Sequence, residues 1–154
     1  MSFVHLKIKK VRDGAIMPRY ATPGSSGFDL HSCVDTPISL SPGAITLFPS
    51  GLAMEIRRGF EGQVRSRSGL SSKHGVQVVN APGTIDSDYR GEVLIPLINL
   101  GPYPYVVQPG ERVAQCVIAP VIQMQLVECD ELGETSRGDK GFGSTGQLEM
   151  EYVG

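Results

Sequence analysis

The sequence predicts an all-β fold arranged as a sandwich, a jelly roll or a barrel. Short apolar runs recur roughly every ten residues, which is typical of these folds. The chain of 154 residues has 19 glycines and 11 prolines scattered between the runs, where they mark turns. One stretch alone, residues 68–74, has a helical pattern. Together these features predict many short strands joined by tight turns.

The predicted elements follow the chain in order. Residues 4–9 alternate between apolar and polar side chains, which is the period of a half-buried first strand. The helix is expected to end at Gly75 in a left-handed conformation. Pro96 lies inside an apolar run and favours a sheet edge or a bulge there. Further strands are expected at residues 38–40, 45–48, 52–56, 63–66, 93–99, 113–118 and 121–127.

Composition divides the chain into two parts. Residues 1–127 are expected to form a single β domain. From Glu128 the sequence becomes acidic and then rich in glycine, with few apolar side chains. Because such a segment is a poor core element, residues 128–154 are expected to form a flexible C-terminal arm.

Bulk composition excludes several classes of protein. Hydrophobic residues make up 40% and charged residues 19%, unlike a disordered chain, and the net charge of -2 argues against a nucleic-acid binder. Three cysteines without a CxxC spacing argue against a disulfide scaffold or a zinc ribbon. The N-terminus lacks a signal-peptide pattern, and no apolar run reaches the roughly 20 residues of a membrane span. We therefore expect a cytoplasmic protein with no nucleic-acid or membrane partner.

The segment at residues 78–91 concentrates polar chemistry. Pro82 and Gly83 are expected to form a type II turn, because proline fixes its own φ and glycine can take a positive φ. A second polar turn carries Asp86, Asp88 and Tyr89. On spacing alone, an ordinary polar loop with Asx turns is the simpler interpretation.

Five segments taken together resemble the ordered motifs of the trimeric dUTPase family. They read ATPGSSGFDL at 21–30, RSRSGLSSKHG at 65–75, NAPGTIDSDYRG at 80–91, GERVAQ at 110–115 and RGDKGFGSTG at 137–146. The resemblance implies a jelly-roll fold and a homotrimer with active sites between subunits. It also implies that the C-terminal arm closes over an active site.

The resemblance further implies a dUTP diphosphatase. Such an enzyme hydrolyses dUTP to dUMP and pyrophosphate by attack of water on the α-phosphorus, with Mg²⁺ as cofactor. It keeps uracil out of DNA and supplies dUMP for dTMP synthesis. Asp86 resembles the catalytic general base, and Asp88 is the neighbouring alternative. A positioned carboxylate accelerates such a step by about 10²- to 10⁴-fold.

Segment 78–91 then corresponds to a nucleotide-binding β-hairpin. The resemblance implies that Tyr89 packs against the deoxyribose, where a ribose 2′-hydroxyl would clash. It implies that the uracil edge is bound by the side chain of Asn80 and by the backbone at Gly83, Thr84 and Ile85.

The phosphates are expected to contact other motifs. In the body of the protein these contacts are Ser68, Gly69, Gln115 and Arg67, with a salt bridge that braces the site as the alternative role of Arg67. In the arm they are Arg137, Gly143, Ser144 and Thr145. Phe142 is expected to stack over the uracil. Lys140 departs from the glycine that many family members have, which adds a cation and reduces backbone freedom in the arm.

Mg²⁺ is expected to be held mainly by the triphosphate, because this ion dehydrates reluctantly and keeps several waters. No direct protein ligand is therefore expected, and Asp29 and Gln115 are expected to act through water. The histidines are dispersed, and neither an HExxH nor an EF-hand pattern occurs.

Three alternatives compete with this prediction. A dCTP deaminase of the same superfamily shares the fold, but the set of Asn80, Asp86 and Tyr89 together with the arm motif favours dUTP hydrolysis. A non-catalytic nucleotide-responsive regulator would be favoured by loss of Asp86 or of the arm, and both are present. An additional partner-binding role stays open. A P-loop hydrolase is not supported, because no GxxxxGK[ST] run occurs.

Overall fold

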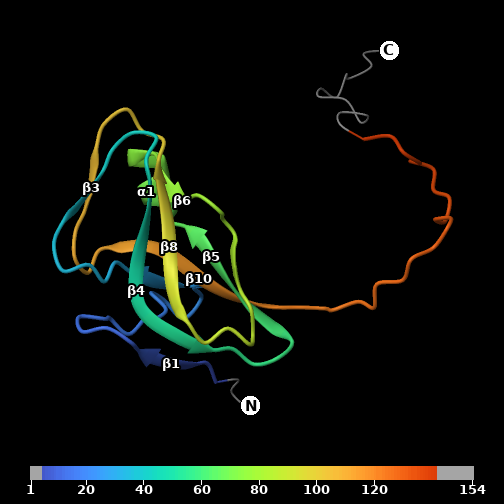
Figure 1. The fold of residues 1–154 in the computed structure, drawn as a ribbon, viewed down its shortest axis with the longest axis horizontal. Coiled ribbons are helices and arrows are strands. Elements are labelled where there is room, and N and C mark those ends of the chain that lie inside the picture. The colour runs from blue at the N-terminus through green and yellow to red at the C-terminus, as the bar shows by residue number, and fades with distance from the viewer. Residues whose placement is uncertain (1–4, 142–154) are drawn as a thin grey trace. The chain divides into compact units, whose positions relative to one another are not determined.

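Ten strands and one helix form in the described part of the computed structural model, residues 5–141 (Figure 1). The chain divides into two units, Met1–Gln123 and Met124–Gly154, and every one of these elements belongs to the first. In chain order they are β1 (Lys7–Lys10), β2 (Phe28–His31), β3 (Ile38–Leu40), β4 (Ile45–Glu55), β5 (Phe60–Ser66), α1 (Ser68–His74), β6 (Val76–Val78), β7 (Gly83–Ile85), β8 (Glu92–Asn99), β9 (Tyr105–Val107) and β10 (Arg112–Pro120).

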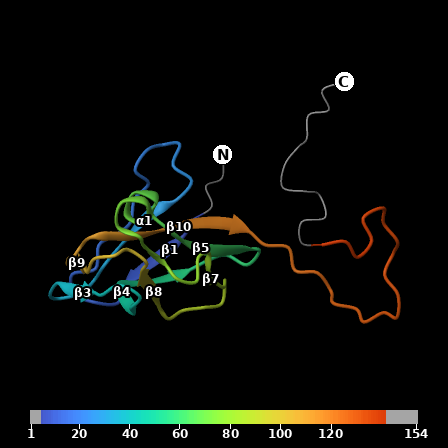
Figure 2. The ribbon, with the colours of Figure 1, turned by 90° about the horizontal axis from the view of Figure 1, so that it is seen from above.

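The strands form two four-stranded antiparallel sheets and a small two-stranded one. The first sheet has the order β1-β4-β8-β6, the second has the order β2-β10-β5-β7, and β3 pairs with β9. Figure 2 shows the large sheets as two layers, with β10 in one and β4 and β8 in the other. The expected all-β, sandwich-like class with one short helix is confirmed. Within residues 5–141 neither large sheet closes into a barrel.

One apolar core lies between the two layers. The first sheet contributes Phe48, Leu52 and Leu97, and the second contributes Leu30 and Cys116, all fully buried. On β8 the buried positions alternate with more exposed ones, as they do when one face of a strand packs inward. The core therefore fixes which side chains of β8 point away from it.

Several expectations about strands need correction. The strands expected at 45–48 and 52–56 are one strand, β4, which ends at Glu55 and whose register against β8 shifts between Pro49 and Ala53. Pro96 is not at a sheet edge, because β8 lies between β4 and β6. Residues 121–127 form no strand, and β10 ends at Pro120. The backbone N–H of Val121 still bonds to Gly59, but the residues after it pair with no strand of the described chain.

Three strands that were not expected are β2, β6 and β9. Each has only three or four residues, too few for a clear alternation. The helix α1 forms where the sequence predicts it and ends at Gly75, whose φ is 70°. In the part of the chain described, no helix has the length and apolarity that crossing a membrane requires.

Candidate active site

A cavity of about 220 Å³ lies beside β7 and the first half of β8. Segment 80–89 contributes six of its lining residues, Asn80, Gly83, Thr84, Ile85, Asp86 and Tyr89. The remaining walls come from β5 and β8, namely Val64, Glu92, Val93, Leu94 and Pro96. Apolar walls with a few polar groups are typical of small-molecule sites. The structure thus brings together the base, sugar and catalytic residues predicted in segment 80–89.

The segment reaches the cavity by crossing between the sheets. β6 and β8 belong to the first sheet, whereas β7 pairs with β5 in the second. The expected β-hairpin within residues 78–91 is therefore wrong, because β6 and β7 lie in different sheets. The expected type II turn is also wrong, because Gly83 lacks a positive φ and instead begins β7.

The side chain of Asn80 packs directly on Gly83. A Cβ atom at Gly83 would lie 3.2 Å from Asn80 Nδ2 and 3.3 Å from Oδ1. Glycine therefore lets the amide lie against the backbone of β7. This arrangement places an amide donor and acceptor next to Gly83 in the lining of the cavity.

Asp86 lies on the border between this cavity and a wider groove of about 820 Å³. Asp88 lines the groove but not the cavity. Arg57, Arg58 and Arg90 also line the groove together with Glu55 and Glu61, so side chains of both charges face it. Of the two aspartates, only Asp86 contacts the same space as Asn80 and Tyr89.

Hydrogen bonds hold the turn that presents these residues. The backbone N–H of Tyr89 donates to the carbonyl of Asp86 at 3.1 Å. Arg90 Nη1 donates to the carbonyl of Ser87 at 2.7 Å and to that of Tyr89 at 2.9 Å. The guanidinium of Arg90 thus braces the turn from outside the cavity, a role that the sequence analysis missed.

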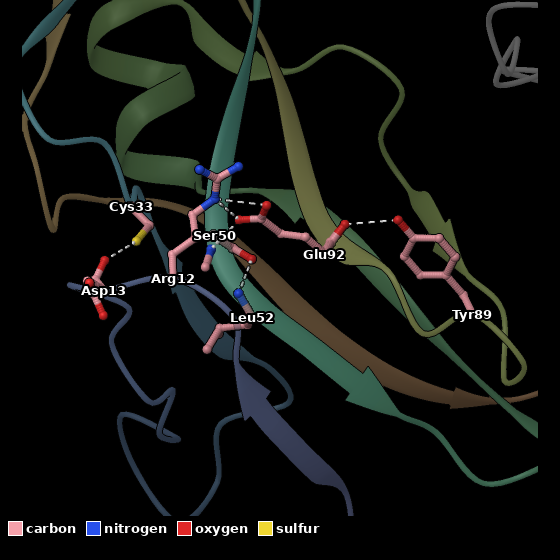
Figure 3. A network of polar contacts seen from close by, with 8 residues as sticks. Arg12, Asp13, Cys33, Ser50, Leu52, Tyr89 and Glu92 are labelled. Carbon is pink, nitrogen blue, oxygen red and sulfur yellow. Dashed lines mark hydrogen bonds and ion pairs between the residues drawn. The ribbon is translucent and has the colours of Figure 1, made fainter.

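Glu92 was also missed, although it follows the motif directly. Its main-chain carbonyl accepts a hydrogen bond from Tyr89 Oη at 3.0 Å (Figure 3). Its carboxylate accepts hydrogen bonds from Arg12 Nε at 2.7 Å and from the Gly51 N–H at 2.9 Å. The Arg12 guanidinium holds the pKa of Glu92 below its ordinary value, and the Gly51 N–H contributes to this effect. Only its position between the YRG turn and an apolar run could have drawn attention to it.

A second cluster forms where β2, β10 and the start of α1 meet. Arg67 Nε donates to Asp29 Oδ1 at 3.0 Å, and Arg112 Nη1 donates to Asp29 Oδ2 at 3.1 Å. Arg67 Nη1 also donates to the carbonyl of Arg112 at 3.0 Å. Gln115 Nε2 donates to the carbonyl of Ser66 at 3.0 Å. The structure thus joins predicted residues from three motifs and adds Arg112, which the sequence analysis missed.

Ser68 and Gly69 begin α1 beside this cluster, and Gly69 is exposed. A Cβ at Gly69 would meet no atom within 4 Å, so a ligand can approach its backbone. Neither residue lines the cavity, and neither does Arg67 or Gln115. Within one chain, the predicted phosphate residues and the predicted base pocket form two separate groups.

The arm motif is described only at its start. Arg137 Nε donates to the carbonyl of Lys140 at 3.0 Å, and Gly138 takes a φ of 58°. Lys140 therefore takes part in a turn with Arg137. Four predicted contacts lie outside the described residues, namely Phe142, Gly143, Ser144 and Thr145.

The side chains near the Asp29–Arg67 cluster offer few ligands to a Mg²⁺ ion. Within residues 5–141, no group of three His, Cys, Asp or Glu side chains converges to hold a metal. Both oxygens of Asp29 are engaged by guanidinium groups. The bond from Gln115 to Ser66 uses its amide N–H and leaves its Oε1 to accept from water. These residues fit an ion that retains its waters and is held by a bound phosphate.

Comparison with known proteins decides the family. The dUTPase family model matches residues 13–146. The chain belongs to the dUTPase family. A relative from Syntrophotalea carbinolica, named deoxyuridine 5'-triphosphate nucleotidohydrolase, is 49% identical over 146 residues, which are 95% of this chain and 99% of that protein. The predicted family is confirmed.

Solved dUTPases share the fold. The dUTPase of Staphylococcus bacteriophage 80alpha with dUPNHPP has a TM-score of 0.83 at 28% identity, over 92% of this chain and 98% of that one. A mutant dUTPase from phage phi11 of S. aureus, described with a structural Mg(II) ion, has a TM-score of 0.75 at 25% identity. The match covers 83% of this chain and 98% of that one.

Proposed function

We propose that this protein hydrolyses dUTP to dUMP and pyrophosphate. The observation that carries the proposal is the cavity lined by Asn80, the β7 backbone, Asp86 and Tyr89 in a chain of the dUTPase family. A phage relative solved with dUPNHPP supports the substrate. The proposal includes a cytoplasmic location, the exclusion of uracil from DNA and the supply of dUMP for dTMP synthesis.

Uracil is recognised by paired polar groups in this proposal. The amide of Asn80 and the backbone from Gly83 through Thr84 to Ile85 offer donors and acceptors to the base edge. A base with a different donor pattern leaves buried groups unpaired, which costs about 1–3 kcal/mol for each group. A cavity of about 220 Å³ is smaller than the roughly 300–1,000 Å³ of sites for drug-sized ligands. The triphosphate therefore extends out of the cavity.

Asp86 is the general base of the proposed reaction. Its position on the border of the cavity puts the carboxylate where the triphosphate leaves the base pocket. It accepts a proton from water as the water oxygen bonds to the α-phosphorus. The bond from that phosphorus to the bridging oxygen then breaks, and pyrophosphate leaves.

The phosphates are bound by the second cluster in this proposal. Arg67 is held in place by Asp29 and by the carbonyl of Arg112, and Ser68, Gly69 and Gln115 lie next to it. Mg²⁺ bound to the triphosphate would neutralise charge on the phosphate oxygens. Gln115 and Asp29 would contact its waters.

The separation of the two groups supports a homotrimer with sites between subunits. The outward face of β4 and β8 gives further support, because it carries apolar side chains in register, Ile45 opposite Ile98, Leu47 opposite Pro96 and Pro49 opposite Leu94. Leu47 is 60% exposed and Leu94 is 45% exposed. Exposed apolar patches of this kind mark contact with other proteins. A second copy on this face would cover the cavity edge formed by Leu94 and Pro96.

The arm completes the site in this proposal. Arg137, Gly143, Ser144 and Thr145 bind the phosphate tail, and Phe142 stacks on the uracil. A segment that orders over bound substrate excludes water from the reaction.

One experiment tests the activity directly. Pyrophosphate release is measured from dUTP, dTTP, dCTP and UTP, each with and without Mg²⁺. We expect rapid release from dUTP with Mg²⁺ and slow release from the other three. Comparable rates on all four nucleotides would exclude the uracil pocket, and deamination of dCTP would identify the alternative enzyme of the superfamily.

A further inference from the structure

Strand β4 carries a bulge opposite the start of β8. Its register shifts between Pro49 and Ala53, so residues 50–52 lie opposite Val93 alone. A bulge removes backbone groups from the ladder and often lies next to a functional site. Those groups need other partners, because an unpaired N–H is costly once shielded from water.

Side chains provide some of these partners. The Leu52 N–H donates to Ser50 Oγ at 3.2 Å, and the Gly51 N–H donates to Glu92 Oε1 at 2.9 Å. The carbonyl of Gly51 accepts from the Val11 N–H at 2.8 Å. The Glu92 carboxylate therefore replaces a strand carbonyl as the acceptor for the Gly51 N–H.

Arg12 holds that carboxylate from the other side. Arg12 Nε lies 2.7 Å from Glu92 Oε1 and 2.9 Å from Oε2. The Glu92 side chain is 17% exposed, and that of Arg12 is 51% exposed. Charge-assisted bonds to a shielded carboxylate are stronger than neutral ones. Arg12 does not line the cavity, so any effect it has on bound substrate is indirect.

The same residue then contacts Tyr89. The main-chain carbonyl of Glu92 accepts from Tyr89 Oη at 3.0 Å, and Figure 3 shows this contact continuous with those to Arg12 and the bulge. The Tyr89 ring covers Gly91, where a Cβ would lie 2.9 Å from the ring Cε2. The hydroxyl is therefore held by Glu92, and the absence of a side chain at Gly91 leaves room for the ring.

We propose that Glu92 is a positioning residue: anchored by Arg12 and the β4 bulge, it fixes the carbonyl that orients the Tyr89 ring against the cavity. The functional consequence rests on the proposed function. If Tyr89 packs against the deoxyribose, this anchor sets how strongly the enzyme prefers dUTP to UTP. Neither Arg12 nor the Glu92 carboxylate needs to touch the nucleotide for this effect.

A first experiment detects changes in the environment of the Tyr89 ring without measuring activity. The chain has five tyrosines, so the full-length protein labelled with 3-fluorotyrosine gives a simple ¹⁹F NMR spectrum, in which Tyr89→Phe assigns one signal. We expect Glu92→Gln and Arg12→Met to shift or broaden the Tyr89 signal, and Arg12→Lys to restore it in part. Lys7→Gln removes another ion pair between strands, Lys7 to Glu55, and is expected to leave the signal unchanged.

A second experiment compares kcat/KM for dUTP with that for UTP. Glu92→Gln and Arg12→Met should lower the preference for dUTP by about three- to tenfold, since small displacements of a positioned group change rates by up to about 10²-fold. In a Tyr89→Phe background the same two changes should have little further effect on the preference, because the hydroxyl contact is already absent.

The outcomes separate the two proposals. An unmoved Tyr89 signal in Glu92→Gln and Arg12→Met would overturn the positioning role whatever the activity. A lowered melting temperature with an unchanged preference would also overturn it, because Glu92 would then be merely structural. A shifted signal in a protein that does not cleave dUTP would support the positioning role and refute the proposed function.

Discussion

Three carboxylates near the proposed site differ in what surrounds them. Both oxygens of Asp29 bond to guanidinium groups, and Glu92 bonds to Arg12 and Gly51. Among residues 5–141, no side-chain hydrogen bond or ion pair engages the carboxylate of Asp86, which is exposed at the cavity border. A general base must be free to accept a proton, so these surroundings favour Asp86 for that role.

Replacing Asp86 should separate binding from chemistry. Asp86→Asn keeps the shape of the side chain but removes the proton acceptor, so turnover should fall by about 10²- to 10⁴-fold. Pyrophosphate release measures the turnover, and calorimetric titration with dUPNHPP checks that binding is retained. Asp88→Asn is the matched control, and a larger loss in that variant would move the catalytic role to Asp88.

The ion pair of Glu92 predicts how stability depends on pH. Because Arg12 lowers the pKa of the folded carboxyl, the pair stabilises the protein above the ordinary glutamate pKa. This contribution is lost as the pH falls through that range toward the lowered value, below about pH 5. Urea unfolding from about pH 3 to about pH 7 should show a shallower decline for Glu92→Gln. Parallel curves for variant and wild type would contradict this linkage.

At the scale of elements, the β4 bulge connects the core to the cavity. Gly51 takes a φ of 71°, and a Cβ there would lie 2.6 Å from Ala15 Cβ and 2.8 Å from Cys33 Sγ. Only glycine satisfies both the left-handed backbone and the lack of space. The bulge is thus fixed by packing from the segments on either side of β2, and its N–H is directed at the first residue of β8.

Substitution in this bulge should be costly. Gly51→Ala combines a left-handed strain of about 1–2 kcal/mol with overpacking of about 1–3 kcal/mol. Gly43→Ala isolates the strain, because Gly43 has a φ of 77° and nothing lies within 4 Å of its would-be Cβ. Chemical denaturation should therefore show a larger loss of unfolding free energy for Gly51→Ala than for Gly43→Ala. Equal losses of unfolding free energy in the two variants would mean that the residues around Gly51 accommodate the added methyl group without strain.

At the scale of the whole molecule, one chain has the parts of a site but does not join them. The cavity and the Asp29–Arg67 cluster share no lining residue, and the apolar outward face of β4 and β8 lies at the cavity edge. Both features are accounted for when another copy of the chain supplies the missing contacts. Assembly and activity should then be lost together.

A charge on the outward face should test this. Leu47→Glu places a carboxylate among apolar side chains that a partner would bury, so we expect dissociation to monomers and a loss of activity. Ser39→Glu adds the same group at an exposed position of β3 and serves as the control. Light scattering after size exclusion measures the mass, and a Leu47→Glu protein with the wild-type mass would place the interface elsewhere.

Removal of the arm motif should affect chemistry and not folding. All strands of the described chain end by Pro120, so a protein lacking residues 137–154 should retain its melting temperature. Its turnover of dUTP should fall steeply, because the proposed phosphate and stacking contacts are absent. Full activity in the truncated protein would contradict the closing arm.

The sequence named residues that line one cavity, but it predicted the strands incompletely. Asn80, Asp86 and Tyr89 could be named because they occur in a motif of fixed spacing. The strand expected at residues 121–127 is absent, and β2, β6 and β9 were missed, because a strand depends on a neighbour that alternation alone does not reveal. The prediction of a type II turn at Gly83 was wrong for a similar reason. Gly83 pairs with β5, and this pairing decides its backbone conformation.

By itself the sequence determined the all-β class, the helix ending at Gly75 and the family, because turn residues, periodicity and motif spacing are local properties of the chain. Only the tertiary structure decided that segment 78–91 crosses between two sheets, that Asp29 bonds to Arg67 and Arg112, and that Glu92 connects Arg12 with Tyr89. These contacts join residues far apart in the chain, such as Arg12 and Glu92. Long-range packing selects them, and no local pattern encodes which distant backbone groups a bulge or a carboxylate will meet.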